Sequence, residues 1–474
     1  MPRSSRRGLD AAATLGLALA LLATACSGGS DAPPTGPENP GRPDGAVASV
    51  TVTLPSPAIT VGGSVTPQAV ARNAAGETVP ATFTWTSSNA DVASVTAGRA
   101  TGVTAGAVNL VATVGSVSGS AALRVDPRNL DAMAEAVRAQ YGLPALSGAI
   151  VSSKGLIGIG VAGTRRATGG PAVTRDDRWH IGSNLKAITA ALAAVAVGRG
   201  DIQWTTTVAE AFPEHAASMR AEYRAVTLQD LLANRGGIRN DPPASAYAGT
   251  TARQQRESLV NWALRQPPAV ARGTYHYSNT GFAMAGAMVE RAMGGTYEAL
   301  LDEHLGKPLG VTTLGWGAAA AAGQSNQPVG HFRQGTGWAA CEACDNPPGL
   351  SAAGRAHMSM PDWARITQAM LAADAGRFAA IKQDDARRMH TGHTVIPNSS
   401  DMYGLGWQVT TRPWGGRTVY HTGSNTTNHS VAWLGLDTGL AFLAATNAAD
   451  FVGGSTGRAL DEMVVKMLTL QQGG

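Results

Sequence analysis

Two patterns of apolar and polar positions follow one another along the chain. Over 47–125 the two kinds of residue alternate, as in SVTVTLP, where Val50 and Val52 share one face. Further alternating runs, such as TFTWTSSNADVASV and VNLVATVGSVSGSAALRV, are separated by Gly, Asn and Asp, and no helical period interrupts them. The pattern predicts a small all-β sandwich over 47–125, with Trp85 in its core.

The segment after residue 126 mixes helices and strands. NLDAMAEAVRAQYG has helical spacing, and STGRALDEMVVKMLTL predicts a final helix. LSGAIVSSKGLIGIGVAG and HSVAWLGLDTGLAFLAATNAAD, near the two ends of the segment, are typical of hairpins, whereas 205–400 is mostly helix and loop. We therefore expect a multidomain protein with an α/β domain over 128–471. Its antiparallel sheet is built from both ends of the segment, is flanked by helices and adjoins a mainly helical lobe.

The first 46 residues are typical of an export signal followed by a flexible tether, and not of a folded domain. A basic start is followed by the apolar run AAATLGLALALLATA and small residues before Cys26. That arrangement resembles the bacterial lipobox and implies lipidation of Cys26 after removal of a signal peptide over 1–25, with a plain secretory peptide as the alternative. Residues 26–46 are rich in Gly, Ser and Pro, which is typical of a flexible tether. We expect a bacterial lipoprotein in the outer membrane, periplasmic or surface-facing, that touches the membrane only through this lipid.

Composition and the cysteines narrow the possible functions. The chain of 474 residues carries a net charge of +4, which gives no electrostatic case for a nucleic-acid partner. Beyond Cys26, the cysteines are Cys341 and Cys344. A local disulfide or two free thiols fit this pair better than a redox motif or a zinc site, which needs about four ligands. We expect no metal and no cofactor.

The clearest candidate chemistry lies in RWHIGSNLKAITAALAAVAV, where Ser183 and Lys186 precede a long apolar run. Three-residue spacing places both side chains on one helical face, next to the free N–H groups of a first turn. The chain has only 5 lysines against 32 arginines, and lysine, unlike arginine, can become a base when its pKa is lowered. The alternative is a capping serine followed by a lysine that reaches the surface.

Two further motifs favour the catalytic interpretation. Ser183-Asn184-Leu185-Lys186 is the only S-x-x-K of the chain, and Tyr277-Ser278-Asn279 is its only Y-x-N. His421-Thr422-Gly423 lies on a predicted strand near the C-terminus. Acyl transfer needs a nucleophile, a base, an acid and two hydrogen-bond donors, and these motifs together supply them.

The order of these motifs resembles the class C-like branch of the serine β-lactamase and penicillin-binding-protein superfamily, through HIGSNLKAITAAL, VTLQDLLANRGGI, YSNTGF, YGLGW and HTGSNTTNHS. The resemblance implies that Ser183 is the acylated nucleophile, Lys186 its base and Tyr277 a proton relay. It implies that Asn279 binds substrate or orients the lysine, and that the oxyanion hole uses the backbone N–H groups of Ser183 and Ser424. His421 and Gly423 belong to the strand that contacts the substrate.

Two departures from that family pattern bear on specificity. Penicillin-recognising members usually have a lysine at the position of His421, and a histidine is mostly neutral at pH 7. This favours an esterase, amidase or D-Ala-D-Ala peptidase over a dedicated β-lactamase. LLANRGGI also differs from the LLTHTSGL of relatives, and we expect Asn234, Arg235 and Gly236 to alter the cleft or the packing beneath it.

The sandwich segment resembles the bacterial immunoglobulin-like domain, group two, a class of spacers and surface-binding modules. Together the resemblances imply a serine hydrolase acting on a small-molecule or peptide substrate, with cell-wall peptide as one option. The alternative is a catalytically inactive binding module at the cell surface.

Overall fold

The computed structural model describes residues 45–450 and 454–473. The expected signal peptide, Cys26 and nearly all of the tether lie outside these residues. Among the described residues, no helix is long and apolar enough to cross a bilayer.

The first part of the described chain is rich in strands, as the alternating pattern predicts. Its strands form three small sheets in the orders β1-β4-β5, β2-β10-β9-β6 and β3-β8-β7. Their bounds are β1 Ser49–Thr53, β2 Ala58–Thr60, β3 Ser64–Val65, β4 Gln68–Arg72, β5 Thr78–Val79, β6 Thr84–Ser87, β7 Ala93–Thr96, β8 Arg99–Gly102, β9 Gly106–Val114 and β10 Val117–Asp126. Val50 and Val52 are buried, but Trp85 is only partly buried and packs at the margin of their cluster. The expectation of Trp85 as a core residue is therefore wrong, because its strand is half-exposed along its length.

The second part is built on a nine-stranded sheet in the order β11-β13-β12-β24-β23-β22-β21-β20-β19. All its pairings are antiparallel except β11 with β13. The bounds are β11 Arg128–Asn129, β12 Ala145–Ser152, β13 Gly155–Gly163, β19 Thr394–Val395, β20 Met402–Tyr403, β21 Gln408–Arg412, β22 Gly416–Ser424, β23 His429–Gly435 and β24 Leu440–Thr446. The two expected hairpins are β12–β13 and β23–β24, and β12 pairs with β24, so the sheet joins both ends of the segment.

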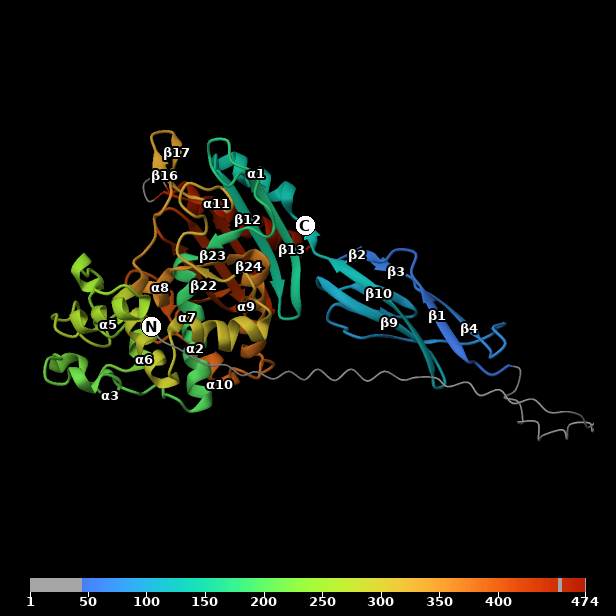
Figure 1. Cartoon of the computed structure of the whole chain (residues 1–474), viewed down its shortest axis with the longest axis horizontal. Coiled ribbons are helices and arrows are strands. Elements are labelled where there is room, and N and C mark those ends of the chain that lie inside the picture. The colour runs from blue at the N-terminus through green and yellow to red at the C-terminus, as the bar shows by residue number, and fades with distance from the viewer. Residues whose placement is uncertain (1–44, 451–453, 474) are drawn as a thin grey trace, which may run out of the picture. The chain divides into compact units, whose positions relative to one another are not determined.

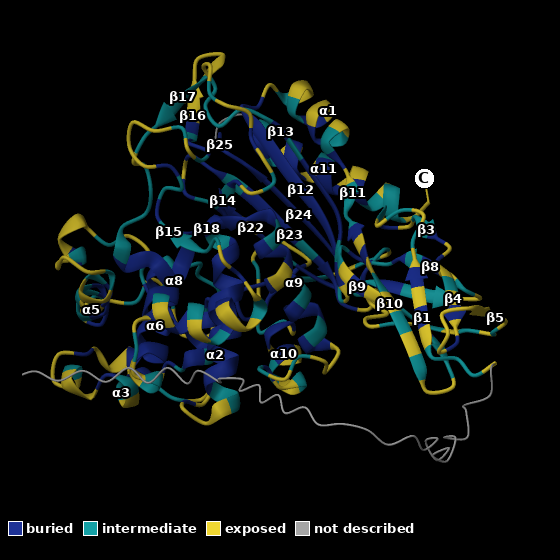
Figure 2. Ribbon diagram, turned by 45° about the vertical axis from the view of Figure 1, so that its right-hand side comes forward, coloured by how far each residue is buried: buried dark blue, intermediate teal, exposed yellow. Residues whose placement is uncertain are grey.

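Helices cover both faces of this sheet. Side chains alternate along each strand, so Ile150 and Phe442 face the apolar sides of α1 (Asp131–Tyr141) and α11 (Ser455–Gln471). On the opposite face, Ala149 packs in a larger core that includes α9 (Met360–Asp374). The central strands are buried on both sides (Figure 2), which explains their almost continuous apolar sequence.

A mainly helical lobe lies between the two halves of the sheet in the sequence (Figure 1). Its other helices are α3 Val208–Ala211, α4 Leu228–Leu232, α5 Ala252–Ala263, α7 Tyr297–Leu301, α8 Ser351–Gly354 and α10 Gln383–Met389. Short strands that we did not expect form two small sheets, β14-β18-β15 and β17-β16-β25. Their bounds are β14 Arg178–His180, β15 Gly315–Trp316, β16 Gly330–Gln334, β17 Gly337–Cys341, β18 Ala356–Ser359 and β25 Ala448–Ala449. Strands of two to five residues are too short to show a period.

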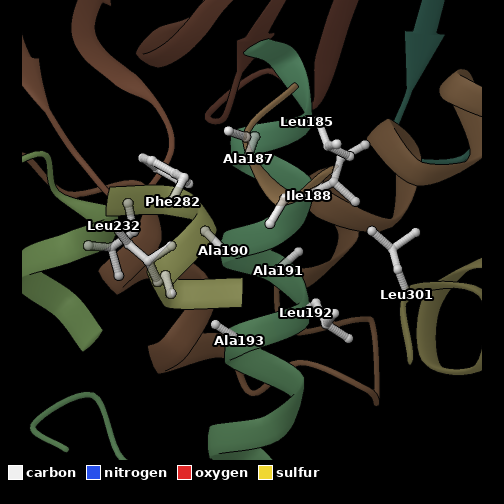
Figure 3. Close-up of a cluster of buried hydrophobic side chains, with 14 of the residues drawn as sticks. Leu185, Ala187, Ile188, Ala190, Ala191, Leu192, Ala193, Leu232, Phe282 and Leu301 are labelled. Carbon is white, nitrogen blue, oxygen red and sulfur yellow. The ribbon is translucent and has the colours of Figure 1, made fainter. Parts of the chain in front are cut away.

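Two buried helices run through the core beside the sheet: α2 (Leu185–Arg199) and α6 (Asn279–Met293). Both are apolar nearly all round, which is typical of a helix surrounded by other elements. Figure 3 shows Ile188 and its neighbours along α2, with Leu232 and Phe282 packed against them. The N-terminal ends of these two helices carry the candidate catalytic residues.

Candidate active site

Ser183 lies in a tight turn between β14 and α2. The turn is a 3₁₀ helix over Gly182–Asn184, and α2 continues it directly, so the serine precedes the α-helix rather than lying in it. Gly182 has φ of 51°, a left-handed conformation that favours glycine. A Cβ atom at this glycine would lie 2.3 Å from the backbone nitrogen of Ser424. The turn therefore presses against the end of β22, and Ser183 stays partly exposed.

The Lys186 amine points at the serine from the first turn of α2. Its Nζ lies 3.0 Å from Ser183 Oγ, 2.7 Å from Asn279 Oδ1 and 2.6 Å from the carbonyl oxygen of Ala353. The lysine side chain is fully buried. It also lies 4.8 Å from the centroid of the Tyr277 ring.

Burial controls the protonation of this amine. Desolvation lowers the pKa of Lys186 well below its ordinary value of 10.5. A neutral amine has two N–H donors and one lone pair. The Asn279 and Ala353 oxygens can only accept, so they take the two N–H groups. The lone pair is then left facing the Ser183 hydroxyl, which is the arrangement that a general base requires.

Tyr277 and Asn279 reach the same point from the start of α6. The side chain of Tyr277 is hydrogen-bonded to Ser183. Burial of the phenol raises the pKa of Tyr277, and the hydrogen bond with Ser183 lowers it by a smaller amount. The tyrosine therefore starts as a neutral O–H at physiological pH. Asn279 orients the lysine rather than pointing away from it.

The strand β22 brings His421, Gly423 and Ser424 to the turn Gly182–Asn184 that carries Ser183, called the nucleophile turn below after the role expected for this serine. A Cβ atom at Gly423 would lie 2.0 Å from the carbonyl oxygen of Ile181, so only glycine permits this approach. The backbone of Ser424 lies against Gly182. This places the Ser424 N–H beside the same turn that carries the Ser183 N–H, as an oxyanion hole requires.

His421 is a neutral imidazole in this structure. Its Nδ1 lies 2.6 Å from the Thr422 carbonyl, which can only accept, so Nδ1 carries the proton and Nε2 accepts from the Tyr403 hydroxyl at 3.0 Å. Burial and the nearby Lys186 lower the pKa of His421 to about 3. Its ring centroid lies 6.2 Å from that of Tyr277. The histidine is part of the site wall but supplies no permanent cation.

Two asparagines that hold the site were not assigned this role from the sequence. The carbonyl of Asn234 accepts the His276 N–H at 2.7 Å, and its Oδ1 accepts the Ser278 N–H at 3.0 Å, so it brackets Tyr277. Its φ of 52° is unusual for a residue other than glycine. The unusual LLANRGGI was the available signal, and it was expected to affect only the cleft or the packing beneath it.

Asn184 fixes the start of α2 to the sheet. Its amide lies between the His421 carbonyl at 2.8 Å and the Ser430 hydroxyl at 2.9 Å. Both contacts are satisfied when the amide nitrogen faces the carbonyl and the amide oxygen faces the hydroxyl. Its place inside the S-x-x-K motif was the only sequence signal for this role.

The remaining chemistry of the described residues is limited. Cys341, the last residue of β17, forms a local disulfide with Cys344. Within the described ranges, no three His, Cys, Asp or Glu side chains gather closely enough to hold a metal ion.

Sequence comparisons match both parts of the chain. The model of the Beta-lactamase family matches residues 130–462, and that of the bacterial Ig-like domain (group 2) matches residues 46–125. Unguisins hydrolase ungD' of Aspergillus campestris is 27% identical over 208 residues, which are 42% of this chain and 39% of that protein. Penicillin-binding protein 4 of Amycolatopsis lactamdurans is 28% identical over 178 residues, 37% of this chain and 46% of that protein. The chain thus spans less than half the length of these curated relatives.

Solved structures share the fold of the second part. An octameric penicillin-binding protein homologue from Pyrococcus abyssi matches with a TM-score of 0.60 and 18% identity, over 71% of this chain and 75% of its own. A D-stereospecific amidohydrolase from a Streptomyces species matches with a TM-score of 0.56 and 21% identity, over 70% of this chain and 96% of its own. D-alanine carboxypeptidase AmpC from Burkholderia cenocepacia matches with a TM-score of 0.56 and 19% identity, over 70% of this chain and 96% of its own. At these identities the likeness shows a common fold.

Proposed function

The chain belongs to the beta-lactamase family, and from this premise we propose that it is a serine hydrolase that forms an acyl-enzyme on Ser183. The observation that carries the proposal is the environment of Lys186, whose fully buried amine lies 3.0 Å from the serine hydroxyl. A buried amine of lowered pKa can accept the serine proton, whereas an ordinary surface lysine is protonated at neutral pH. Ser183 remains partly exposed, so a substrate carbonyl can reach it.

During acylation each proton that leaves one group is taken up by another. Ser183 Oγ attacks the substrate carbonyl while its proton passes to Lys186 Nζ, 3.0 Å away. The carbonyl oxygen becomes an oxyanion that accepts from the backbone N–H groups of Ser183 and Ser424. Tyr277 donates its phenol proton to the leaving group as the carbonyl–heteroatom bond breaks, and the lysine ammonium returns a proton to the tyrosine.

Deacylation reverses these roles with water as the nucleophile. Tyr277 and Lys186 take a proton from the attacking water, and the tetrahedral intermediate again rests on the two backbone donors. Collapse of that intermediate releases the acid and returns the proton to Ser183 Oγ. The net reaction is hydrolysis of one ester or amide bond.

The substrate class follows from the charge of the site wall. The neutral His421 stands where penicillin-recognising relatives usually place a lysine, so this position offers no fixed cation to a substrate carboxylate. By this argument an ester or an amide suits the site better than a β-lactam, whereas a D-amino-acid peptide that ends in a free carboxylate would need a cation from elsewhere in the site. The D-stereospecific amidohydrolase and the D-alanine carboxypeptidase among the structural relatives support the same range.

The test is intact-mass spectrometry of the full chain after exposure to a panel of acylating compounds. The panel holds a fluorophosphonate, a short-chain nitrophenyl ester, a D-Ala-D-Ala peptide and a penicillin. We expect one adduct at Ser183 with the fluorophosphonate, turnover of the ester or the peptide, and little or no turnover of the penicillin. Ser183→Ala should form no adduct.

The control is Ser424→Ala, which removes a hydroxyl from the site but keeps the backbone N–H that the mechanism uses. It should still be labelled. An adduct that persists in Ser183→Ala would contradict the assignment of the nucleophile. A folded wild-type chain that no compound modifies would favour a binding module instead.

A further inference from the structure

A buried histidine–aspartate pair lies directly behind the nucleophile turn. His180 ends β14, three residues before Ser183, and Asp345 follows the disulfide formed by Cys341 and Cys344. The His180 Nε2 lies 3.0 Å from Asp345 Oδ1, and the two side chains are only 2% and 6% exposed. Neither residue has a part in the proton transfers described above.

The tautomer of His180 is fixed by its other nitrogen. Nδ1 accepts the backbone N–H of Gly182 at 3.1 Å, so it carries no proton. In a neutral ring the proton then lies on Nε2, which contacts Asp345 Oδ1 at 3.0 Å without the alignment of a hydrogen bond. The carboxylate therefore packs against the imidazole whose Nδ1 receives the Gly182 N–H, one residue before Ser183.

The same carboxylate oxygen also holds the other side of the site. Asp345 Oδ1 accepts from Asn425 Nδ2 at 3.1 Å, and Asn425 directly follows Ser424. The Asn425 Oδ1 in turn accepts the backbone N–H of Asn428 at 2.9 Å, so this side chain organises the connection from β22 to β23. One carboxylate thus links the segments that carry the two backbone donors.

We propose that Asp345 and His180 are positioning residues that hold the backbone N–H groups of Ser183 and Ser424 at the separation an oxyanion needs. This inference rests on the proposed function, since it concerns how that site is held. Burial alone raises the pKa of Asp345, but the contact with His180 and the hydrogen bonds from Asn425 and the Asn346 backbone outweigh it and hold the pKa below its usual value. The disulfide one residue earlier restrains the chain that presents this carboxylate.

A second buried pair in the same domain provides a matched control. His390 Nδ1 lies 3.0 Å from Asp374 Oδ1, and these side chains are 1% and 4% exposed. Asp374 also pairs with Arg417, which lies near the first residue of β22, whereas Ser424 is the last. The two pairs match in distance and burial but differ in what they touch.

The experiment compares Asp345→Asn with Asp374→Asn in the full chain by steady-state kinetics and by hydrogen exchange followed by mass spectrometry. For Asp345→Asn we expect kcat to fall by up to about 100-fold with KM nearly unchanged, because donors displaced by a fraction of an ångström lose transition-state contacts. Exchange should rise together in peptides over 181–184 and 424–428. Asp374→Asn should raise exchange around His390 and leave kcat within about twofold.

A kcat for Asp345→Asn within about twofold of the wild type would overturn the proposal, as would exchange that rises only around residue 345. Should Asp345→Asn fail to fold, Asn425→Ala cuts only the link to the second donor. It should raise exchange over 424–428 alone and lower kcat less; unchanged exchange there would equally defeat the proposal. A wild type that reacts at no serine would defeat the proposed function, yet the exchange data would still decide whether the carboxylate couples the two segments.

Discussion

The helices α2 and α6 are alike except where they begin. Each has 15 residues, each is buried over most of its length, and each ends at a glycine of positive φ, Gly200 and Gly294 respectively. α6 has a conventional start, since the Ser278 hydroxyl accepts the Gly281 N–H at 2.9 Å. α2 has no side-chain cap and is preceded instead by a 3₁₀ turn.

The two helix starts, which both carry candidate catalytic residues, are therefore held in different ways. The Ser183 N–H, which the proposed mechanism uses as an oxyanion donor, belongs to the 3₁₀ turn before α2 and not to α2 itself. The start of α2 is instead fixed by the sheet, through Asn184 and the close approach of Gly423. The start of α2 is thus held by tertiary contacts, whereas α6 has its own side-chain cap.

The sharpest test of this comparison changes the buried lysine in the first turn of α2, Lys186. Lys186→Met should lower kcat/KM by about a thousandfold or more, because a general base contributes roughly 10²–10⁴ to the rate. In the wild type, kcat/KM should fall as pH drops through the lowered pKa of Lys186, since only the neutral amine accepts a proton. Measured pH–rate profiles of the wild type should show that acid limb.

The same substitution has a predicted effect on stability. The folded chain holds Lys186 neutral and the unfolded chain protonates it, so the free energy of unfolding of the wild type should rise with pH from the folded pKa up to about 10.5. Each unit of that lowering corresponds to about 1.4 kcal/mol. Denaturant unfolding at pH 7 and pH 9.5 should show this rise in the wild type and a smaller one in Lys186→Met.

The matched control is Lys466→Met on α11, where the lysine side chain is 43% exposed. It should change neither kcat/KM nor the pH dependence of unfolding noticeably. If Lys186→Met kept most of its activity, Lys186 would be an ordinary buried lysine and not the general base.

A smaller effect is expected from the glycine that lets the sheet hold α2. In Gly423→Ala the new Cβ would lie 2.0 Å from the Ile181 carbonyl, so β22 and the nucleophile turn must move apart. We expect kcat to fall about 100-fold, since a displacement of this size disturbs the oxyanion donors. Kinetics and thermal unfolding would measure it.

The control for that change is Gly457→Ala in α11, where the nearest atom outside the local helix would lie 3.6 Å from the new Cβ. A glycine inside a helix is replaced by alanine with a gain of roughly 0.5–1 kcal/mol, so this variant should be as stable as the wild type or more so. Equal activity of Gly423→Ala and Gly457→Ala would mean that the approach of β22 is not needed for catalysis.

The smallest effect is expected at the cap of α6. Ser278→Ala removes a capping hydroxyl and should lower the free energy of unfolding by about 1 kcal/mol, with kcat changed no more than a few-fold. Thr296→Ala, which removes the same kind of cap from α7, should cost a similar amount. If Ser278→Ala lowered kcat as far as Gly423→Ala does, the cap of α6 would matter as much for catalysis as the approach of β22 to the turn before α2.

The sequence predicted what depends on local spacing. Helix α1 and the hairpins β12–β13 and β23–β24 follow from periodicity that one window contains. Ser183 and Lys186 could be paired because they lie three positions apart in the sequence. Tyr277 and His421 could be added only because recognisable motifs surround them.

What the sequence did not predict depends on distant contacts. Trp179 of β14 pairs with Met358 of β18, and strands this short have no pattern of their own. The carbonyl of Ala353 is a main partner of Lys186, but a backbone carbonyl leaves no mark in a sequence. His180 and Asp345 are 165 positions apart and meet only in the folded chain.

The pairing of β12 with β24 sets an order of events for a chain made from its N-terminus. Ser183 and Lys186 leave the ribosome more than two hundred residues before Gly423 and Ser424 do. The two backbone N–H groups that would form the oxyanion hole, those of Ser183 and Ser424, can therefore meet only after β22 has been made and has joined the sheet.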